Sequence, residues 1–532
     1  MRISPLLQLI VFLMTIEHIS LYRRKFRRAH LEANKWNLFK SNGKSAIINA
    51  FSPQQIHISY GKTPADIVIL WATQIKEPKM EVQYNADPGT KPISVVGEQI
   101  EFANGGVKSA KYWHRAYIRN LKPGIKYFYR IINKQNGAVT VSEVSHFTVP
   151  PTKVNIVHTY MVLADMGTQT INLPFIVQEA RNKQYTAIFH IGDIAYDLQR
   201  DKGLVGDKFL NSIQPMASNI PYMVSPGDHE LGSDFQEYCS RFSMPNLGWP
   251  MKADKLWYSF DVGAAHFISL NTEVFFSHKK RKNPQLEWLK KDLQTVNSKR
   301  NNRQWVIVLG HRPLYSSCDN RKDCLNETAT MRKELEDLFF RNGVDLYIGG
   351  HYHNYERSWP VYQQKVIFSH YKNPKAPVYI TVGTLGSIYL NEKINKPNGV
   401  WSAKRISDGI ENYGTLDVIN ATHLRWKVFA AQNNKKLDLV WIIQQHPRRF
   451  GDPKEYLTFK QKPPRAPLPP EPNLEYKKHD EKYMYFRSYR PNFQRRGMLF
   501  KEAGLIIALL TVCSFAVLLC VFYKKLWRRA RF

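Results

Sequence analysis

Carboxylates, histidines and one tyrosine follow five apolar, strand-like runs of this 532-residue chain. The runs read HTYMVLAD, YTAIFHIGDIAYD, NIPYMVSPGDHE, RQWVIVLGHRP and GVDLYIGGHYH. Their polar residues are Asp165, Asp193, Tyr196, Asp228, His229, His311, His351 and His353. In an open α/β sheet, ligands bind at the carboxyl ends of buried strands. We therefore expect these side chains to form one metal centre.

Seven of these residues carry oxygen or nitrogen donors suited to metal ions: Asp165, Asp193, Tyr196, Asp228, His311, His351 and His353. One tetrahedral ion needs fewer donors, so the set favours two ions that share a bridging carboxylate. Tyr196 favours Fe(III), because a phenol with a pKa of about 10 becomes a ligand only beside a strong Lewis acid. His229 follows Asp228 directly and can donate a proton to a leaving alcohol or orient a phosphate.

Two different periodicities predict the domains that hold these residues. Residues 52–150 show short alternating runs separated by turn signals, which predicts a β-sandwich with Trp71 as a core residue. From 151 to 445, strands alternate with helical stretches at 283–297 and 328–342, which is typical of an α/β domain. The length of the chain also exceeds what one hydrophobic core supports.

The N-terminal segment predicts export. Residues 1–20 contain an apolar run, Leu6–Ile16, of the length found in signal peptides. A basic lead-in, 21–51, follows, and its cluster at 23–28 either opposes translocation or forms a dibasic processing site. The sequence leaves open whether this segment is cleaved.

The C-terminal segment predicts a membrane anchor. Residues 446–503 form a stalk rich in proline and basic residues, and 504–523 form an uncharged apolar stretch long enough to span a bilayer. The basic tail, 524–532, is expected in the cytoplasm. We therefore expect a single-pass type I membrane protein with its catalytic domain in the secretory lumen, at the cell surface or in the lysosome.

Sequons and cysteines agree with a luminal location. Asn326 and Asn420 begin Asn-X-Thr sequons and are predicted glycosylation sites. Cys318 and Cys324 lie in a segment expected to be a polar loop and can close a small disulfide. Cys513 and Cys520 lie in the apolar stretch 504–523, which leaves Cys239 over. The net charge of +32 favours anionic substrates or surfaces, or it is a general feature of composition. No nucleic-acid-binding module stands out, so no specific nucleic-acid partner is expected.

The motifs D-x-G, GD-xx-YD, G-D-H-E, V-x-GHRP and GG-H-x-H-x-YER resemble those of metallophosphoesterases. The tyrosine of GDIAYD resembles that of the purple acid phosphatases within them. The match covers about residues 52–445 and includes a fibronectin type III-like N-terminal domain, as in the large two-domain branch that occurs in animals. The resemblance implies a catalytic domain of two mixed sheets flanked by helices.

The resemblance also implies an activity, which is hydrolysis of phosphate monoesters by attack of a metal-bound hydroxide. Its cofactors would be Fe(III) and a divalent ion, zinc, iron or manganese. The resemblance also implies a role for each residue. Asp165, Tyr196 and His353 would bind Fe(III), Asp193 would bridge the two ions, and Asp228, His311 and His351 would bind the divalent ion. His229 would act as the acid.

The chain departs from the family pattern at the metal centre and its rim. Asp228 stands where the family has asparagine, so the ligands carry a charge of about −4 instead of −3. This change predicts tighter divalent-ion binding, weaker phosphate affinity and a higher pH optimum. In the segment 383–389, Ile388 and Tyr389 replace a polar edge, and the loop Ser316–Cys324 lacks a histidine of some relatives.

Two other functions remain compatible with the sequence. One is a catalytically weak, membrane-anchored binding or adhesion protein that retains the metal site. The other is a phosphodiesterase on nucleotides, because a metal cluster does not distinguish between one and two ester bonds. The sequence also leaves open whether the chain forms a homodimer, and which phosphate ester is its physiological substrate.

Overall fold

The computed structural model describes residues 52–444, apart from 75, 77–79, 88, 104–109, 136–137, 300–304, 318–321, 387–397 and 408. The predicted signal peptide, basic lead-in, membrane-spanning segment 504–523 and cytoplasmic tail lie outside these residues, as does the stalk. Within the described ranges, every helix is too short or too polar to cross a bilayer.

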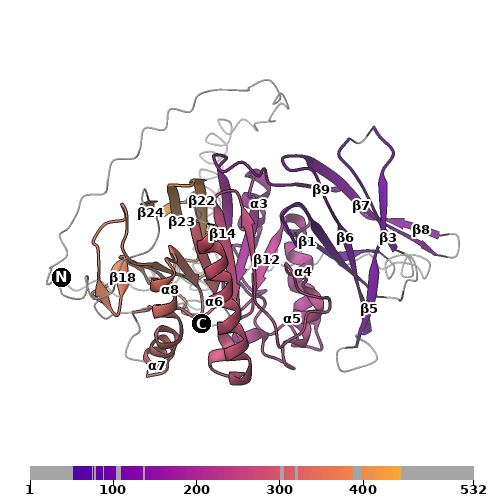
Figure 1. Cartoon of the computed structure of the whole chain (residues 1–532). Helices are drawn as coiled ribbons and strands as arrows, with labels where there is room; N and C mark the ends of the chain where they lie inside the picture. The colour runs from indigo at the N-terminus through magenta and orange to yellow at the C-terminus, as the bar shows by residue number, and fades with distance from the viewer. Residues whose placement is uncertain are drawn as a thin grey trace, which may run out of the picture. The chain divides into compact units, whose positions relative to one another are not determined.

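The N-terminal domain is a sandwich of two antiparallel sheets (Figure 1, indigo and violet). The first sheet has the order β1 (Gln54–Tyr60), β2 (Ile67–Thr73), β6 (Ala110–Ile118) and β5 (Glu98–Ala103). The second has the order β4 (Ile93–Val96), β3 (Met80–Asn85), β7 (Lys126–Gln135) and β8 (Ala138–Val141), with β9 (Ser145–Thr148) also paired to β7. Trp71 is fully buried on β2, as predicted.

The sequence patterns underestimated the strands of the sandwich. The sequence predicts six strands in residues 52–150, none of them at β4 or β5, and the last predicted run, 141–149, is divided between β8 and β9. Most residues of β4 are exposed, including Ile93 and Val96. An edge strand of this kind lacks the alternation of apolar and polar residues on which the prediction depended.

The catalytic domain contains two large mixed sheets. One has the order β12 (Tyr222–Ser225), β11 (Ala187–Ile191), β10 (His158–Leu163), β22 (Asn412–Asn420), β23 (His423–Ala430) and β24 (Lys436–Ile443). The other has the order β13 (Tyr258–Val262), β14 (Ala265–Leu270), β15 (Trp305–Gly310), β16 (Leu346–Gly349), β20 (Val378–Val382), β17 (Tyr355–Ser358) and β21 (Ser402–Ile406). Strands β10 to β12 are parallel, and so are β14, β15, β16 and β20. A short hairpin, β18 (Val361–Tyr362) and β19 (Lys365–Val366), is separate.

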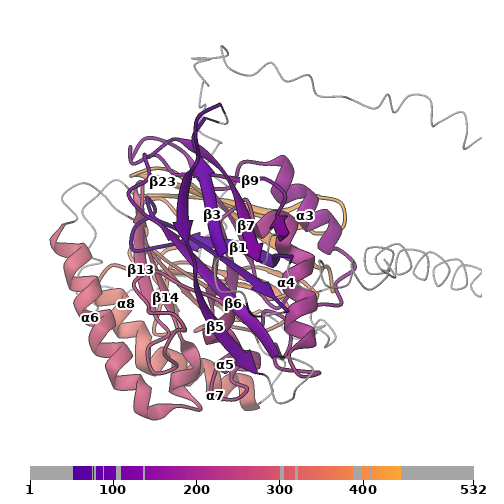
Figure 2. The same ribbon diagram turned by 90° about the vertical axis from the view of Figure 1, so that its right-hand side faces the viewer.

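Helices cover the sheets (Figures 1 and 2). They are α3 (Leu173–Asn182), α4 (Leu204–Ala217), α5 (Gln236–Arg241), α6 (Lys282–Ser298), α7 (Lys322–Met331) and α8 (Asp337–Arg341). Short turns of other helix types are η2 (Asp228–Glu230), η3 (Thr272–Phe275), η4 (Lys279–Arg281) and η6 (Arg332–Glu336). Leu289 of α6 and Phe339 of α8 pack in one apolar cluster with Val306 and Val308 of β15, so both helices cover the same face of the seven-stranded sheet.

Helix α6 confirms the prediction of a helix at 283–297. The second predicted helix, 328–342, is part of a longer helical stretch, 322–341, with a π-helical turn at its centre. The expectation that Cys324 lies in a loop was therefore wrong. The first turns of α7 are polar and exposed on several sides, so their sequence shows no apolar stripe that would mark a helix.

The sandwich and the catalytic domain share one continuous hydrophobic core. Polar contacts also join them: the Tyr60 hydroxyl donates to the Thr186 carbonyl at 2.7 Å, and the Tyr129 hydroxyl donates to the Ser218 carbonyl at 2.7 Å. His57 Nε2 lies 2.8 Å from the carbonyl of Arg241. The sandwich is therefore packed firmly against the six-stranded side of the catalytic domain.

Candidate metal centre

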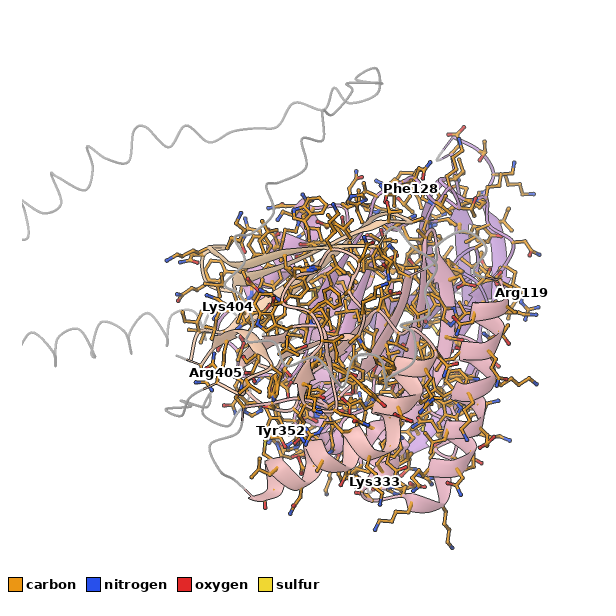
Figure 3. All side chains as sticks on the ribbon, turned by 60° about the vertical axis from the view of Figure 1, so that its left-hand side comes forward. Arg119, Phe128, Lys333, Tyr352, Lys404 and Arg405 are labelled. Atoms are coloured by element: carbon orange, nitrogen blue, oxygen red, sulfur yellow. The ribbon has the colours of Figure 1, made fainter. Side chains whose placement is uncertain are left out.

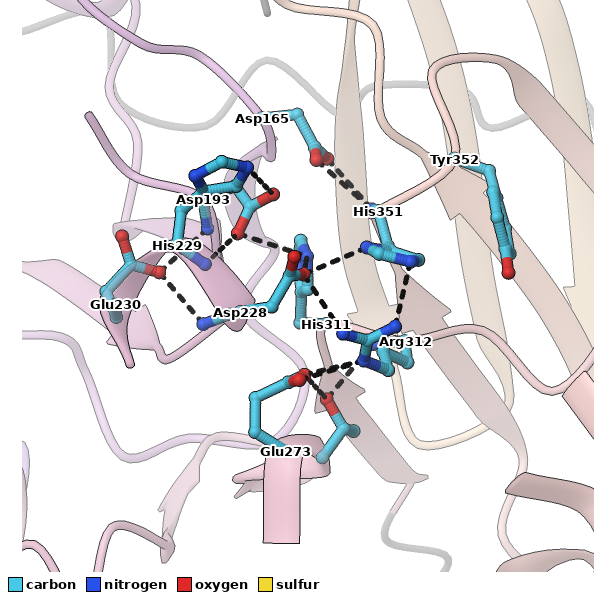
Figure 4. Close-up of polar contacts among 12 residues, drawn as sticks. Asp165, Asp193, Asp228, His229, Glu230, Glu273, His311, Arg312, His351 and Tyr352 are labelled. Carbon is cyan, nitrogen blue, oxygen red and sulfur yellow. Dashed lines mark hydrogen bonds and ion pairs between the residues drawn. The ribbon is translucent and has the colours of Figure 1, made fainter. Parts of the chain in front are cut away.

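The carboxyl ends of five parallel strands from both large sheets supply the candidate ligands (Figure 4). Asp165 follows β10, Asp193 follows β11, and Asp228 follows β12 within three residues. His311 follows β15 directly, and His351 comes two residues after β16. The structure thus brings Asp165 and His351, which are 186 residues apart in sequence, into contact.

Four of the predicted ligands form a compact group. One donor atom each from Asp193, Asp228, His311 and His351 lies within 4.8 Å of the others. The Asp228 Oδ1 atom is 3.0 Å from His351 Nδ1 and 3.2 Å from His311 Nε2. His311 Nδ1 lies 2.9 Å from the carbonyl of Ile191. A proton donated to this carbonyl leaves the lone pair of Nε2 directed at the carboxylates, as a metal ligand requires.

The remaining predicted ligands form a second group beside the first. The Tyr196 hydroxyl is 3.0 Å from His353 Nε2, and it is 3.5 Å from Asp165 Oδ1. His353 Nε2 lies 3.7 Å from the same carboxylate oxygen. Tyr196 and Asp165 are fully buried. A phenol, an imidazole and a carboxylate that meet at one buried point have the donor types of a ferric site.

The electrostatics of the centre favour bound cations. Burial raises the pKa of Asp165 well above its ordinary value, and neighbouring Asp193 raises it further, against the effect of His311. Burial also raises the pKa of Asp228, but hydrogen bonds from His311 and His351 outweigh it and hold that pKa far below its usual range. Buried carboxylates at this density need positive charge to compensate them. The donor set therefore fits a pair of metal ions.

The backbone at the ligands is strained. Asp165, Asp193, Tyr196 and His351 have φ angles of 55°, 50°, 51° and 69°, in the left-handed region. Each such residue costs about 1–3 kcal/mol, and such strain tends to concentrate at functional sites. Figure 4 shows the carboxylates of Asp165 and Asp193, from two of these strained loops, directed toward one centre.

Two glycines allow the ligand loops to approach one another. A Cβ atom on Gly227 would lie 2.4 Å from Asp193 Oδ1, and one on Gly350 would lie 2.5 Å from Asp165 Oδ2. No side chain fits at these distances. The glycines before Asp228 and His351 are therefore required by the close contact of loops.

Glu230, the last residue of the G-D-H-E motif, is a structural residue that the sequence interpretation missed. Its carboxylate accepts hydrogen bonds from the backbone nitrogens of Asp193, Ile194 and Gly227, each at 2.9 Å. It is buried, and burial raises its pKa to about 7, with Asp193 adding to the effect. Glu230 therefore ties the loop of Asp193 to the loop of Asp228.

Arg312 and two glutamates form a group beside Asp228 and His351 that the sequence interpretation also missed. Arg312 Nε lies 2.8 Å from Glu273 Oε2, and its Nη1 lies 2.9 Å from Glu327 Oε1. Its Nη2 is 3.4 Å from Asp228 Oδ1. The extra negative charge of Asp228 thus faces a guanidinium, which the charge count from the sequence did not include. Arg312 was visible in the GHRP motif, but neither glutamate belongs to a motif.

His229 lies beside the group of Tyr196 and is oriented by a carboxylate. Its Nδ1 is 3.0 Å from Asp197 Oδ1, and its ring centre is 4.6 Å from that of Tyr196. The side chain is 17% exposed, so it is accessible to a substrate. Burial opposes the charged form, but Asp193, Asp197 and Asp228 together raise the pKa of His229 above its ordinary value. The arrangement suits a proton donor, and Asp197 is a further residue of the GDIAYD motif without a predicted role.

The remaining predicted features are the two sequons, the cysteine pair and the segment with Ile388 and Tyr389. Asn326 is exposed on α7, and Asn420 ends β22, where its Oδ1 accepts a hydrogen bond from the Thr422 backbone at 2.8 Å. Glycosylation at both stays a prediction. Cys324 is disulfide-bonded, but Cys318 lies outside the described residues, so their pairing also stays a prediction. Ile388 and Tyr389 lie outside the described residues as well.

Three family models match consecutive parts of the chain. Residues 53–149 match the purple acid phosphatase N-terminal domain. Residues 158–355 match the calcineurin-like phosphoesterases. Residues 376–439 match the iron/zinc purple acid phosphatase-like protein C.

Characterised proteins show the same similarity. Human acid phosphatase type 7 is 36% identical over 415 residues, which cover 74% of this chain and 91% of the human protein. Purple acid phosphatase 18 of Arabidopsis thaliana is 30% identical over 400 residues, which cover 73% and 84%. The solved structure of a purple acid phosphatase from yellow lupin seeds shares the fold, with a TM-score of 0.64 at 23% identity over 74% of this chain and 75% of that one.

Proposed function

This chain belongs to the purple acid phosphatase family, and we propose that it hydrolyses phosphate monoesters with an Fe(III) ion beside a divalent ion of zinc, iron or manganese. It is an acid phosphatase with a two-metal centre. The observation that carries the choice of metals is the Tyr196 hydroxyl, 3.0 Å from His353 and next to the Asp165 carboxylate. A phenolic oxygen in this position is a ligand for a ferric ion rather than for zinc or magnesium.

The grouping of the donors supports the following division of roles. Fe(III) would be held by Asp165, Tyr196 and His353, the divalent ion by Asp228, His311 and His351, and Asp193 would bridge the two. When bound, the ions supply positive charge that stabilises the transferring phosphoryl group and make an attacking water more acidic.

The residues outside the ligand set act on the leaving group and on the charge of the site. His229 gives its Nε2 proton to the oxygen of the departing alcohol, while Asp197 holds Nδ1 at 3.0 Å and fixes the ring. Arg312 offsets the charge of Asp228 from 3.4 Å. Glu230 keeps the two loops in register through its three backbone contacts.

The visible spectrum tests the choice of metals. The purified full-length protein is expected to contain iron and to absorb visible light through charge transfer from Tyr196 to Fe(III). Tyr196→Phe is expected to lose this band, because phenylalanine has no ligand oxygen, whereas Tyr117→Phe in the sandwich is expected to keep it. Metal analysis and turnover of p-nitrophenyl phosphate between pH 4 and 8 complete the measurement. A protein without iron, or a band that persists in Tyr196→Phe, would contradict the proposal.

Asp228→Asn is expected to bind the divalent ion more weakly, to bind inorganic phosphate more tightly and to shift the pH optimum of activity downward. The physical reason is the removal of one negative charge from the site. Because Arg312 already faces Asp228 at 3.4 Å, we expect each change in affinity to stay within about tenfold. Inhibition constants for phosphate and pH–rate profiles measure the effects.

Asp234→Asn is the matched control for this prediction, because it removes the same charge away from the centre. Asp234 pairs with Arg281. An upward shift of the optimum in Asp228→Asn, or a loss of activity, would show that the charge argument is wrong.

The two other functions considered from the sequence are not favoured. A weak adhesion protein needs no complete two-metal donor set, yet seven donors converge here. No described feature singles out nucleotides, so a phosphodiesterase gains no support beyond the shared metal chemistry.

We propose that the enzyme is anchored in a membrane by residues 504–523, with its catalytic domain in the lumen or outside the cell. The support is the uncharged apolar stretch with basic residues directly behind it, together with the exposed position of Asn326 in its sequon. A loss of mass on enzymatic deglycosylation of the native protein tests the location of the domain.

A further inference from the structure

Glu327 on helix α7 contacts the outer nitrogen of the candidate ligand His351. We propose that Glu327 is a positioning residue that keeps His351 in the one tautomer able to bind the divalent ion. This inference rests on the proposed function, because it assumes that His351 is a metal ligand. Glu327 itself would not touch the ion.

His351 has a carboxylate at each ring nitrogen. Nδ1 lies 3.0 Å from Asp228 Oδ1, and Nε2 lies 3.0 Å from Glu327 Oε2. Nδ1 is the nitrogen that faces the other candidate ligands. A neutral imidazole carries its proton on one nitrogen only, so Nδ1 is free to bind a metal when the proton is on Nε2. Glu327 accepts a hydrogen bond from that proton and therefore favours the required tautomer.

Arg312 favours the opposite tautomer. Its Nη1 lies 3.0 Å from His351 Nε2, and a guanidinium can only donate hydrogen bonds. If Nε2 accepted this bond, the proton would move to Nδ1 and face Asp228, and Nδ1 could not bind a metal. Glu327 opposes this effect, because its Oε1 lies 2.9 Å from the same Nη1 while its Oε2 lies 3.0 Å from the ring nitrogen. One carboxylate thus engages both the ring proton and the competing donor.

The carboxylate of Glu327 is held in place by its own partners. The Tyr352 hydroxyl donates to Oε2 at 2.5 Å, while Arg312 binds Oε1. Arg312 is in turn fixed by fully buried Glu273 at 2.8 Å. Charge-assisted bonds of this kind are strong and directional. Figure 3 shows Tyr352 on the side of the molecule away from Arg119 of the sandwich.

Helix α7 carries Glu327 to this position. Arg332, in the helical turn that follows, donates from Nη1 to the carbonyl of Leu314 at 2.7 Å, which ties the helix to the segment after His311. Buried Thr328 also anchors the inner face of α7. Both sides of the contact with His351 are therefore built on packed elements.

The test is the affinity of the metal-depleted full-length protein, reloaded with iron, for Zn²⁺, measured by competition with a chromophoric chelator. Glu327→Gln can still accept a hydrogen bond from the ring N–H and is expected to weaken Zn²⁺ binding by about tenfold. Glu327→Ala cannot, and it is expected to weaken Zn²⁺ binding by up to about 100-fold. The tyrosine-to-iron absorption band should be unchanged, because it arises from Tyr196, whereas Glu327 acts on the ring of His351. The control is Glu334→Gln, a glutamate of the same helical stretch that pairs with Lys282.

The outcomes separate this inference from the proposed function. If the wild-type protein takes up two ions and Glu327→Ala binds Zn²⁺ within about twofold of it, the positioning role is wrong and the phosphatase proposal stands. If the wild-type protein itself fails to bind a second ion, the proposed function fails. If the Glu327 variants do not fold, Tyr352→Phe decides, because it removes only the hydroxyl that holds Glu327. A severalfold weaker affinity for Zn²⁺ in this variant supports the inference, and an unchanged affinity overturns it.

Discussion

Asp193→Ala is expected to lower phosphatase activity by about a thousandfold or more and to release metal from the protein. Two ions supply several kcal/mol of transition-state stabilisation, and each 1.4 kcal/mol or so corresponds to a factor of ten in rate. Asp193 is 2% exposed, and its Oδ1 lies 3.3 Å from His311 Nε2 and 3.1 Å from the backbone nitrogen of His229. Asp193 also raises the pKa of Asp165 in the second ligand group, so its loss is expected to affect both ions.

Metals per chain and kcat/KM for p-nitrophenyl phosphate, measured on the same preparation, check this expectation. Asp254→Ala, an exposed aspartate of the same domain, is the control and should retain full activity. If Asp193→Ala kept both metals and most of its activity, a bridging role for this carboxylate would be excluded.

His229→Ala is expected to slow hydrolysis of an alkyl phosphate by about 100- to 10 000-fold, the usual contribution of general acid catalysis. With p-nitrophenyl phosphate the loss should be much smaller, because p-nitrophenolate leaves readily without a proton. The structural reason is the position of His229 beside the centre, where Asp197 holds Nδ1 at 3.0 Å and Nε2 lies 4.0 Å from Asp193 Oδ2. Turnover of the two substrates by wild type and variant provides the comparison.

Metal content should be unchanged in His229→Ala, since His229 is not among the expected ligands. His370→Ala, an exposed histidine of the catalytic domain, serves as the control. Equal losses on both substrates would mean that His229 orients the phosphate instead of protonating the leaving group.

The sequence predicted the charge of the ligands but not the charge of the groups around them. Counting ligand charges identified Asp228 as the unusual residue, and the structure retains it beside His311 and His351. The count did not include Arg312, whose guanidinium lies 3.4 Å away. The expected effects of Asp228 are therefore smaller than those predicted from the ligands alone.

The sequence by itself determined the family, the sandwich and the residues that follow the parallel strands. Each of these depends on local order: a buried strand is a continuous apolar run, and the residues after it are found by counting along the chain. For this reason Asp165, Asp193 and His311 could be named as candidates without coordinates.

Only the tertiary structure decided which groups support the ligands. Glu273 and Glu327 belong to no motif, and they contact Arg312 because η3 and α7 pack beside the end of β15. Glu230 was visible in a motif, but its bonds to the loop of Asp193 span 37 residues. Such contacts arise from the packing of elements that are distant in sequence, and packing leaves no periodic pattern in the residues that take part in it.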